Sequence, residues 1–506
     1  MSATARPDPR VMVAQARAAV ARGERGPALA ILTRAAEAFP RLSALQVEFG
    51  NLAFAQGDRA AAEAAYLRAI AADPRDFAAL IGLGNALRER GEASEAIERY
   101  RQATAIAPTV DVGWYNLGLA LREVGLFDEA IAAYDRALAI DPRKPACWYN
   151  RGNALTGTTR FADAIASYDE ALRLRPDYIE AVYSKSMALL LNGDLAQGWD
   201  LYEARWRSRL SSSTPRFATL PQWEGEPLEG KRLLVWGEQG IGDEVRFLSV
   251  LGEVVIEAGA VFYAGERRLR TLIARSFPRV ILTEPSLRDD ETAAQADVQS
   301  PVGSLARFRR RAFADFPAPP RPFLFPDADL QRGWGEWLAG LSSCSQRRLR
   351  IGISWRTGRN ARRKQARYAS LDAWGRFLAS LRAEFVCLQY DACDDDLAHF
   401  RERFGIEVRV PPGLDRRDDF EGMGGLYAAL DAIVSAPNTV ADFAGALGVP
   451  CWVIVHAPHW PWGIWPQAGA AGQPWYASLS MIDARQGGWD AAFGCVRTAL
   501  EARFAD

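Results

Sequence analysis

The sequence predicts an α-solenoid followed by an α/β region of two doubly wound lobes, and three observations support this prediction. A proline recurs every 34 residues through the first two hundred, at Pro40, Pro74, Pro108, Pro142 and Pro176. A fixed period of this length is typical of stacked helix-turn-helix repeats. Beyond residue 231 the period ends, and short apolar runs alternate with helical patterns, as in parallel sheets. A proline-rich segment, residues 311–330, divides these runs into two series.

The length and composition indicate a folded protein of several domains. The chain has 506 residues, whereas a single core stops growing at about 250–300 residues. The formal net charge of −1 argues against a general nucleic-acid binder, because such proteins carry a basic excess. No segment approaches the ~18 apolar residues of a membrane span, and the first residues lack the apolar core of a secretory signal. We therefore expect a cytoplasmic protein without a membrane span.

Neither the cysteines nor the histidines predict a metal site. The six cysteines include no CxxC pair, so reduced core residues are expected. Of the three histidines, His456 and His459 are close in sequence but could supply only two ligands. Aspartates 394–396 begin a predicted helix, where the helix dipole alone favours acidic residues. We expect no metal ion.

Each repeat of the first half carries the same internal pattern. Small residues recur where two helices must cross closely, at Ala28, Ala62, Ala96, Ala130 and Ala164. Large partners recur four residues later, at Tyr66, Tyr100, Tyr134 and Tyr168. Glycines mark the same close approach on the first helix, at Gly50, Gly84, Gly118 and Gly152. The pattern predicts a continuous core that is shared between neighbouring repeats.

Asparagines also recur along the predicted first helices. Asn51, Asn85 and Asn153 share one repeat position, and Asn116 and Asn150 share another, three residues earlier. Stacked carboxamides can pair with the backbone of an extended peptide without reading its side chains. The alternative is that each asparagine caps a helix or bonds within its own repeat.

The repeat positions resemble the tetratricopeptide repeat, and residues 113–142 are nearly a consensus copy. The resemblance covers about residues 9–210, which we assign as the first domain. Solenoids of this kind act as concave binding surfaces for protein partners. The asparagines are similar to the asparagine ladder of the eukaryotic O-GlcNAc transferase, which implies that they bind a protein acceptor.

The second half is expected to form two lobes after a connector at residues 211–230. Strands of the first lobe (231–325) are predicted in the apolar runs at 233–236, 260–265, 279–284 and 296–301. Strands of the second lobe (326–506) are predicted in the runs at 348–358, 384–391, 406–410, 430–438 and 450–458. Because ligands of such sheets bind at the carboxyl ends of strands, the cleft between the lobes is the expected site.

One strand end suggests an anion site. The stretch "APNTVADFAGALG" follows the apolar run "LDAIVS" and places Asn438 and Thr439 at the start of a predicted helix. The N–H groups there and the helix dipole favour a phosphate. Simple capping of the helix by either residue is the alternative interpretation.

Several segments of the second half resemble heptosyltransferase-like glycosyltransferases of the GT-B fold. The segment "EQGIGDEVRF" (238–247) looks like their first strand, loop and helix. The segments "IGISWRTG", "FVCLQYD", "LYAALDAIVSAPNTVADFAGALGVPCWVIV" and "PWYASLSMI" look like their nucleotide-sugar lobe. The full arrangement is similar to bacterial tetratricopeptide-repeat glycosyltransferases, including those that modify flagellin with nonulosonic acids such as pseudaminic acid.

The resemblance implies roles for particular residues. Asp243 is the implied general base and Glu238 is the alternative, since the acceptor hydroxyl must lose a proton. Cations and N–H groups must stabilise the leaving phosphate. The implied donor-binding residues are Gly240, Gly242, Ser354, Arg356, Thr357, Lys364, Arg367, Gln389, Tyr390, Asn438 and Thr439. Many relatives carry histidine where this chain has Asp442, so no imidazole role is carried over.

These inferences together predict a protein glycosyltransferase that uses a nucleotide-sugar and no metal or other cofactor. Its repeats would hold a protein acceptor such as flagellin, and its lobes would transfer the sugar to a serine or threonine. The alternative is a non-enzymatic repeat scaffold whose lobes are degenerate.

Overall fold

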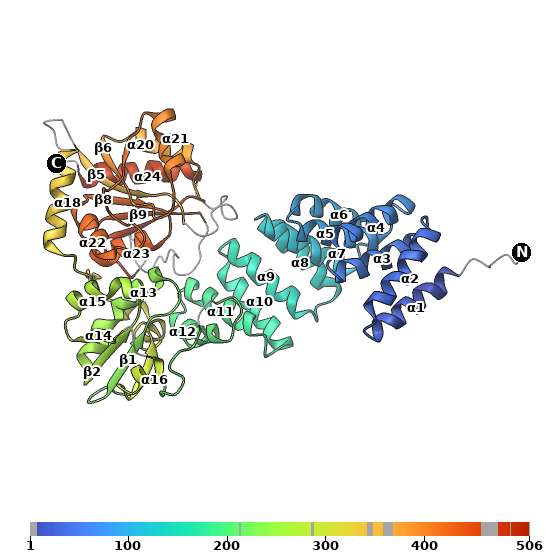
Figure 1. The fold of residues 1–506 in the computed structure, drawn as a ribbon, viewed down its shortest axis with the longest axis horizontal. Coiled ribbons are helices and arrows are strands. Elements are labelled where there is room, and N and C mark those ends of the chain that lie inside the picture. Colours follow the sequence, from blue (N-terminus) through green and yellow to red (C-terminus); the bar gives the residue numbers. More distant parts are fainter. Residues whose placement is uncertain are drawn as a thin grey trace, which may run out of the picture. The chain divides into compact units, whose positions relative to one another are not determined.

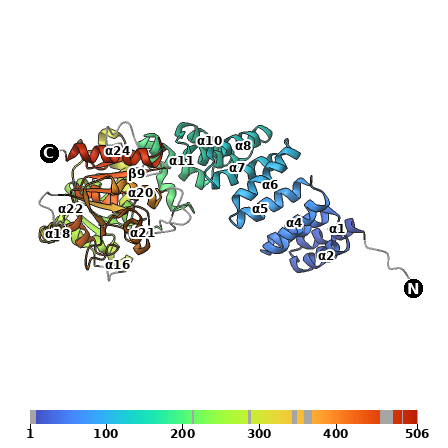
Figure 2. The same ribbon diagram turned by 90° about the horizontal axis from the view of Figure 1, so that it is seen from above.

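The chain forms two compact units, one up to Ala181 and one from Val182. The computed structural model describes residues 8–211, 214–284, 288–341, 348–357, 368–456, 474–485 and 487–504. The first unit is entirely helical in these residues, and the second contains both parallel sheets (Figures 1 and 2). An α-solenoid followed by an α/β region is therefore confirmed.

The first unit consists of helices that pack in successive antiparallel pairs. Their bounds are α1 (Pro9–Ala21), α2 (Arg25–Ala38), α3 (Ser43–Ala55), α4 (Arg59–Ala72), α5 (Phe77–Glu89), α6 (Ala93–Ile106), α7 (Asp111–Glu123), α8 (Phe127–Ile140), α9 (Pro145–Gly157) and α10 (Phe161–Leu174). Aspartates begin some of them: Asp76 accepts a hydrogen bond from the N–H of Ala79 at 3.0 Å and so caps α5. A further helix, α11 (Ile179–Asn192), crosses the boundary between the units.

The core of the solenoid is the predicted alanine–tyrosine–glycine pattern. The five recurring alanines and the four recurring tyrosines are all buried. A methyl group added to Gly84 would lie 2.5 Å from the ring of Tyr100, and the same clash recurs in the other repeats. Only glycine therefore allows the tyrosine of each repeat to pack against the first helix.

The turn between the two helices of a repeat requires a left-handed residue. Glycine supplies it at Gly57, Gly91 and Gly125, where φ is 87°, 89° and 82°. The equivalent position of the next repeat is Thr159, with φ 62°. A β-branched residue is disfavoured in this region, so Thr159 is a site of backbone strain.

The boundary between the units falls earlier than the predicted end of the first domain at residue 210. The segment after α11 comprises α12 (Leu195–Tyr202) and the 3₁₀ turn η1 (Glu203–Trp206). It packs on the first lobe: Nε1 of Trp199 donates to the carbonyl of Arg310 at 2.8 Å, and Asp200 pairs with Arg311 at 3.0 Å. These contacts explain why residues up to 206 belong to the second unit.

Sheet A, in the first lobe, has four parallel strands in the order β3-β2-β1-β4. Their bounds are β1 (Arg232–Trp236), β2 (Ala260–Ala264), β3 (Val280–Leu282) and β4 (Val298–Pro301), and each lies in a predicted run. The accompanying helices are α13 (Ile241–Phe247), α14 (Leu251–Glu257), α15 (Arg270–Ser276), α16 (Asp289–Ala293) and α17 (Leu305–Arg309), with 3₁₀ turns η2 (Leu248–Val250), η3 (Arg267–Leu269), η4 (Val302–Ser304) and η5 (Phe313–Asp315). The connector covers the edge of β4, since Trp223 N–H donates to the carbonyl of Gln299 at 2.7 Å.

Sheet B, in the second lobe, has six parallel strands in the order β10-β9-β8-β5-β6-β7. The bounds are β5 (Leu349–Ser354), β6 (Ala383–Cys387), β7 (Val408–Arg409), β8 (Ala432–Ser435), β9 (Cys451–Val455) and β10 (Leu479–Asp483). Helices α18 (Ala328–Gly340), α20 (Leu371–Ala379), α21 (Asp394–Phe404), α22 (Phe420–Ala429), α23 (Thr439–Leu447) and α24 (Gly488–Arg503) accompany the sheet (Figure 1). Strand order reverses between β5 and β8, so the sheet is doubly wound with a switch point there.

Candidate functional site

The two lobes meet where α13 of the first lobe crosses α23 of the second. A methyl group on Gly242 would lie 3.0 Å from Oδ2 of Asp442 and 3.1 Å from Oγ1 of Thr439. Gly242 therefore permits close contact between the helices. This packing position differs from the donor contact that the resemblance implied for Gly242.

A cleft of about 600 Å³ lies beside this crossing. It is lined from both lobes by loops that follow the carboxyl ends of strands and by helices α22 and α23. The lining residues are Gln239, Gly240, Ile241, Glu266, Arg268, Thr357, Tyr390, Asp391, Ala392, Arg416, Arg417, Phe420, Met423, Tyr427, Thr439, Val440 and Phe443. Its volume suits a small-molecule ligand. Of the predicted donor-binding residues, Gly240, Thr357, Tyr390 and Thr439 are among them.

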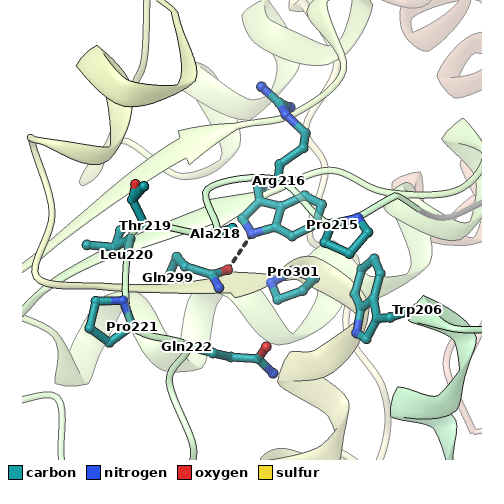
Figure 3. Close-up of a pocket in the computed structure, with 11 residues that line it drawn as sticks. Trp206, Pro215, Arg216, Ala218, Thr219, Leu220, Pro221, Gln222, Gln299 and Pro301 are labelled. Carbon is teal, nitrogen blue, oxygen red and sulfur yellow. Dashed lines mark hydrogen bonds between the residues drawn. The ribbon is translucent and has the colours of Figure 1, made fainter.

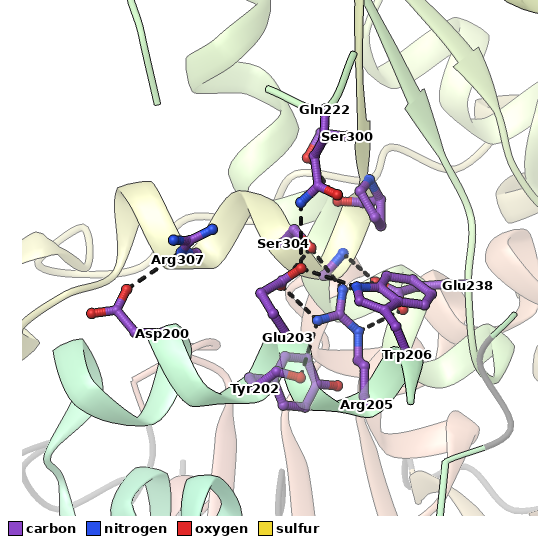
Figure 4. A network of polar contacts seen from close by, with 12 residues as sticks. Asp200, Tyr202, Glu203, Arg205, Trp206, Gln222, Glu238, Ser300, Ser304 and Arg307 are labelled. Atoms are coloured by element: carbon purple, nitrogen blue, oxygen red, sulfur yellow. Dashed lines mark hydrogen bonds and ion pairs between the residues drawn. The ribbon is translucent and has the colours of Figure 1, made fainter. Parts of the chain in front are cut away.

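The crevice at the switch point of sheet A, between β1 and β4, is filled by Arg205 (Figure 4). Its Nε and Nη2 donate to the two oxygens of Glu238 at 2.9 and 2.8 Å, and Nη2 also donates to Oγ of Ser304 at 2.7 Å. The guanidinium carbon lies 4.1 Å from the ring centre of Trp206. Glu238 is thus a buried ion-pair partner of Arg205, and its role as the alternative base stays a prediction.

The switch point of sheet B, in contrast, is bordered by the cleft. Asn438 is buried and joins its two central strands: its Nδ2 donates to Oγ of Ser354 at 2.9 Å, and its Oδ1 accepts from the N–H of Val440 at 3.0 Å. Asn438 therefore caps α23, as the alternative interpretation stated. Its neighbour Thr439 lines the cleft at the first turn of the helix.

Gln389 and Ser354 are fully buried behind the cleft wall. Oε1 of Gln389 accepts from the N–H of Trp355 at 3.1 Å and from the N–H of Arg356 at 3.3 Å. These bonds fix the loop that follows β5. Both residues support the site from behind, whereas direct donor contact had been predicted.

Arg356 is held by acidic residues instead of lining the cleft. Its guanidinium pairs with Asp396, lies 3.4 Å from Oδ2 of Asp391, and donates to the carbonyl of Ala392 at 2.9 Å. Two carboxylates already neutralise this cation, and the predicted phosphate contact of Arg356 stays a prediction.

Three other arginines line the cleft, and sequence reasoning missed all of them. Arg268 pairs with Glu266 and Asp418, both at 2.8 Å. Nη1 of Arg416 donates to Sγ of Cys387 at 2.7 Å. Arg417 is exposed, and no ion pair of its side chain is found in the described part of the chain. Arg416 and Arg417 lie in the segment "LDRRDDF" after β7. The neighbouring aspartates cancel their charge, so the net charge of this segment does not indicate a basic site.

Asp243, the predicted base, lies in the first turn of α13. It is 3.3 Å from Nη1 of Arg246, whose Nη2 also donates to Asp442. Burial raises the pKa of Asp243 above its usual value, although Arg246 opposes this. The side chain nevertheless keeps 34% of its surface exposed, so solvent can reach it. Burial also raises the pKa of Asp442 to about 7.

The loop between β1 and α13 is strained next to the cleft. Gln239 has φ 62°, a left-handed conformation that is uncommon for residues other than glycine. Strain of this kind concentrates at binding and catalytic sites. It is a second indication, independent of the volume, that the cleft is functional.

A second pocket, of about 530 Å³, lies at the carboxyl ends of β1 and β4 in the first lobe (Figure 3). The connector forms one wall with Pro215 and Pro221, and Trp206 and Pro301 form another. Gln299 projects from β4 and accepts from Nε1 of Trp236 at 2.6 Å. Apart from Arg216, which pairs with Asp289, its lining carries no ionisable side chain, unlike the cleft.

The predicted acceptor-binding asparagines are on the first helices of the solenoid. Oδ1 of Asn51, Asn85 and Asn153 accepts from the tyrosine hydroxyl of the same repeat at 2.8, 2.7 and 2.8 Å. Asn150 is buried, and its Nδ2 donates to the hydroxyl of Tyr115 at 3.1 Å. Asn116 is half-buried. The bonds within repeats are therefore present, and the acceptor role stays a prediction.

Some predicted residues cannot be placed. Lys364, Arg367 and His459 lie outside the described residues. In the described ranges, no cluster of three or more His, Cys, Asp or Glu side chains could hold a metal ion. Likewise, none of the described helices is both long and apolar enough to cross a membrane.

The fold defines a tetratricopeptide-repeat solenoid joined to an α/β region with an arginine-lined cleft. Comparison with known families agrees for the repeats: residues 47–111, 112–144 and 145–178 each match the tetratricopeptide repeat. The chain is similar to Protein FlbA of Caulobacter vibrioides, with 30% identity over 335 residues, or 63% of this chain and 54% of that protein. The chain thus spans about half the length of this curated relative.

Solved structures also resemble part of the chain. A crystal structure of MamA is 23% identical with a TM-score of 0.31, and covers 33% of this chain and 90% of its own. YrrB, a TPR protein with an unusual peptide-binding site, is 20% identical with a TM-score of 0.32, at 36% and 93% coverage. PilF of Pseudomonas aeruginosa is 17% identical with a TM-score of 0.37, at 40% and 93% coverage.

Proposed function

We propose that the second unit is a glycosyltransferase that moves a sugar from a nucleotide-sugar to a protein held by the repeats. The observation that carries this proposal is the cleft between two doubly wound lobes. Strand ends from both sheets contribute to its lining, and three arginines are among the lining residues. Parallel sheets bind nucleotides at such strand ends.

The cleft offers the groups that glycosyl transfer needs. Arg416, Arg417 and the first turn of α23 at Thr439 provide positive charge for a diphosphate or phosphate. Tyr390, Phe420 and Tyr427 provide aromatic surface for a base or a sugar ring. The resemblance to heptosyltransferase-like enzymes supports a nucleotide-sugar as the ligand of this combination.

Asp243 is the proposed general base. The pKa of Asp243 is raised, and a general base is most effective when its pKa lies closer to the working pH. The first turn of α13 places it next to Gly240, a residue of the cleft wall. A proton taken from an acceptor hydroxyl would reside on this carboxylate while Arg246 and Asp442 hold its position.

The proposed acceptor is a protein, such as flagellin, bound as an extended segment along the asparagines. In each repeat the tyrosine hydroxyl donates to Oδ1 of the asparagine. Because Oδ1 faces the tyrosine, we infer that the Nδ2 donors of Asn51, Asn85 and Asn153 face away from the core. Amide donors suit the carbonyl groups of a peptide backbone. An extended peptide that follows the first helices would meet these donors on α3, α5 and α9.

Binding of nucleotides to the full chain tests the enzymatic proposal. Calorimetry with UDP, GDP, ADP and CMP compounds should give saturable binding to at least one of them, and thermal stabilisation should follow from it. Absence of binding by every nucleotide would favour the alternative of a repeat scaffold with degenerate lobes. Intact-mass analysis of flagellins from cells with and without the protein then tests the acceptor.

The acceptor role of the asparagines needs variants that leave no buried hydroxyl unpaired. The paired changes Asn85→Leu with Tyr100→Phe, and Asn153→Leu with Tyr168→Phe, remove the amides together with their bound hydroxyls. The matched control, Tyr100→Phe with Tyr168→Phe, keeps both amides. Acceptor capture should fall only in the first set; equal capture by both sets would assign the asparagines a purely structural role.

A further inference from the structure

Two buried cysteines lie together at the two ends of a loop that lines the cleft. Cys387 is the last residue of β6 and Cys393 is the N-cap of α21, and their Sγ atoms are 3.7 Å apart. A disulfide has a bond of about 2.05 Å, so each sulfur would have to move toward the other by less than about 1 Å to join them. The five residues between them include Tyr390, Asp391 and Ala392, which line the cleft.

Arg416 makes this pair electropositive. Its Nη1 donates to Sγ of Cys387 at 2.7 Å and lies 3.8 Å from Sγ of Cys393. The hydrogen bond shared with Cys387, followed by the Arg416 guanidinium, lowers the pKa of the Cys393 thiol to about 6. Both effects favour the thiolate, which is the reactive form of cysteine.

A small molecule can approach the pair from the side opposite Arg416. Cys393 lines a cavity of about 820 Å³ next to α21, whereas Arg416 lines the cleft. The sulfurs thus lie in the wall between two cavities. Cys387 itself is fully buried, so an attacking molecule meets Cys393 first.

We propose that Cys387 and Cys393 form a reversible disulfide site whose oxidant is a small peroxide. The Cys393 thiolate attacks one oxygen of hydrogen peroxide, the O–O bond breaks, and the hydroxide that leaves takes a proton to become water. The resulting sulfenic acid is attacked by the sulfur of Cys387, which loses its proton, and a second water leaves. The two sulfurs together lose two electrons to the peroxide, and a dithiol reverses the reaction.

The disulfide changes the cleft because it removes the negative charge that the cysteine pair carries when ionised, and Arg416 donates to this pair through Sγ of Cys387. The guanidinium loses this counter-charge and becomes available to a ligand in the cleft, where Arg417 already lies. Formation of the bond also draws together the two ends of the loop that carries Tyr390 and Asp391. We expect the oxidised protein to bind pyrophosphate with a different affinity from the reduced protein.

Mass spectrometry of the full chain tests the site without any assumption about the proposed function. Trypsin cleaves after Arg382 and Arg401, so both cysteines fall in one peptide, residues 383–401. After submillimolar peroxide, quenching and alkylation, this peptide should be about 2 Da lighter than its reduced form and carry no alkyl group. A dithiol should restore two alkylatable thiols. Cys495, which is exposed, serves as the internal control for exposure to oxidant.

Variants separate the pair from general oxidation. Cys393→Ser should abolish the light peptide while the melting temperature stays unchanged, and Arg416→Gln should slow its formation about tenfold because less thiolate is present. Arg416→Lys should restore the rate. If Cys495 is oxidised while peptide 383–401 keeps two alkylated thiols, the disulfide site is refuted. Pyrophosphate binding that is unchanged in fully oxidised protein would refute the link to the cleft alone.

Discussion

Arg205 holds Glu238 through two parallel hydrogen bonds of 2.9 and 2.8 Å, and both side chains are buried. The pair fastens the segment that follows the solenoid to the switch point of sheet A. A carboxylate in a glycine-rich loop at a strand end thus has a structural function in this chain. The arginine-lined cleft borders the switch point of sheet B instead.

The first prediction concerns this ion pair. Glu238→Gln should destabilise the second unit by up to about 3–5 kcal/mol, because it removes one of the two carboxylates, with Glu203, that pair with the buried Arg205 guanidinium. The triple variant Arg205→Met, Glu238→Leu and Glu203→Gln should recover most of the loss. Urea unfolding followed by tryptophan fluorescence measures both.

The control for this prediction is an exposed ion pair of the same lobe. Arg216 and Asp289 are 42% and 51% exposed, so Arg216→Met should cost less than about 1 kcal/mol. Equal losses for Glu238→Gln and Arg216→Met would show that burial of the Arg205 pair adds nothing.

The fold could be predicted from the sequence because its signals are local and repeated. The period of 34 residues predicts the solenoid, and each apolar run from residue 231 onward became a strand of a parallel sheet.

The site was predicted only in part. Thr357, Tyr390 and Thr439 directly follow strands and line the cleft, as strand ends should. The sequence does not show which side chains pair with one another in the fold. Arg356 also lies at a strand end, but Asp396 of the later helix α21 neutralises its charge.

The arginines of the cleft show the same limit. Arg268 and Arg416 come from loops separated by almost 150 residues in sequence, and only the meeting of the two lobes places them in one cavity. The sequence also pointed to Lys364 and Arg367, which lie outside the described residues, so their donor role stays a prediction.

The second prediction concerns a missing asparagine. In the repeat of α7 and α8, Leu119 occupies the position of Asn85, and the buried hydroxyl of Tyr134 lacks a hydrogen bond of good geometry in the described part of the chain, although the nearby Arg122 guanidinium partly opposes the effect of burial on its pKa. Leu119→Asn should stabilise the solenoid by about 1 kcal/mol, because it restores this bond. Urea unfolding followed by far-UV circular dichroism measures the change.

Tyrosine variants provide its control. Tyr134→Phe should be neutral or stabilising, whereas Tyr100→Phe should destabilise because it breaks the 2.7 Å bond to Asn85. In the Tyr134→Phe background, Leu119→Asn should lose its benefit. A gain that persists there would come from a contact other than the hydroxyl.

The third prediction concerns the strained turn at Thr159. Because the other repeats have glycine here with φ near 85°, Thr159→Gly should relieve the cost of a left-handed threonine. That cost is about 1–2 kcal/mol, and the greater freedom of glycine in the unfolded chain returns about 0.5–1 kcal/mol of it. We expect a net gain of up to about 1 kcal/mol. The reverse change, Gly125→Thr, should lose a similar amount, and a loss from Thr159→Gly would contradict the assignment of strain.

The fourth prediction concerns the pH dependence of transfer. A base acts only when ionised, so activity should rise with pH through the pKa of Asp243, which burial places above the usual value for aspartate. The acidic limb of kcat/KM against pH should therefore lie at higher pH than for an ordinary aspartate. Asp243→Asn should abolish turnover and leave donor affinity nearly unchanged. Turnover that survives this change would remove Asp243 from the chemistry.

The last prediction distinguishes two arginines that the sequence alone treats alike. Arg417 lines the cleft without an ion pair in the described part of the chain, while Arg356 is neutralised by Asp391 and Asp396. Arg417→Gln should weaken binding of a nucleoside diphosphate by about 10- to 100-fold, the equivalent of one charge-assisted contact worth about 1.5–3 kcal/mol. Arg356→Gln should change the affinity less than about threefold, because its charge is already used. Calorimetry at two salt concentrations measures both, and the wild-type dependence on salt should decrease only in Arg417→Gln. If Arg356→Gln instead causes the larger loss, the phosphate lies on the side of the acidic cluster and the arginine-lined cleft holds another part of the donor.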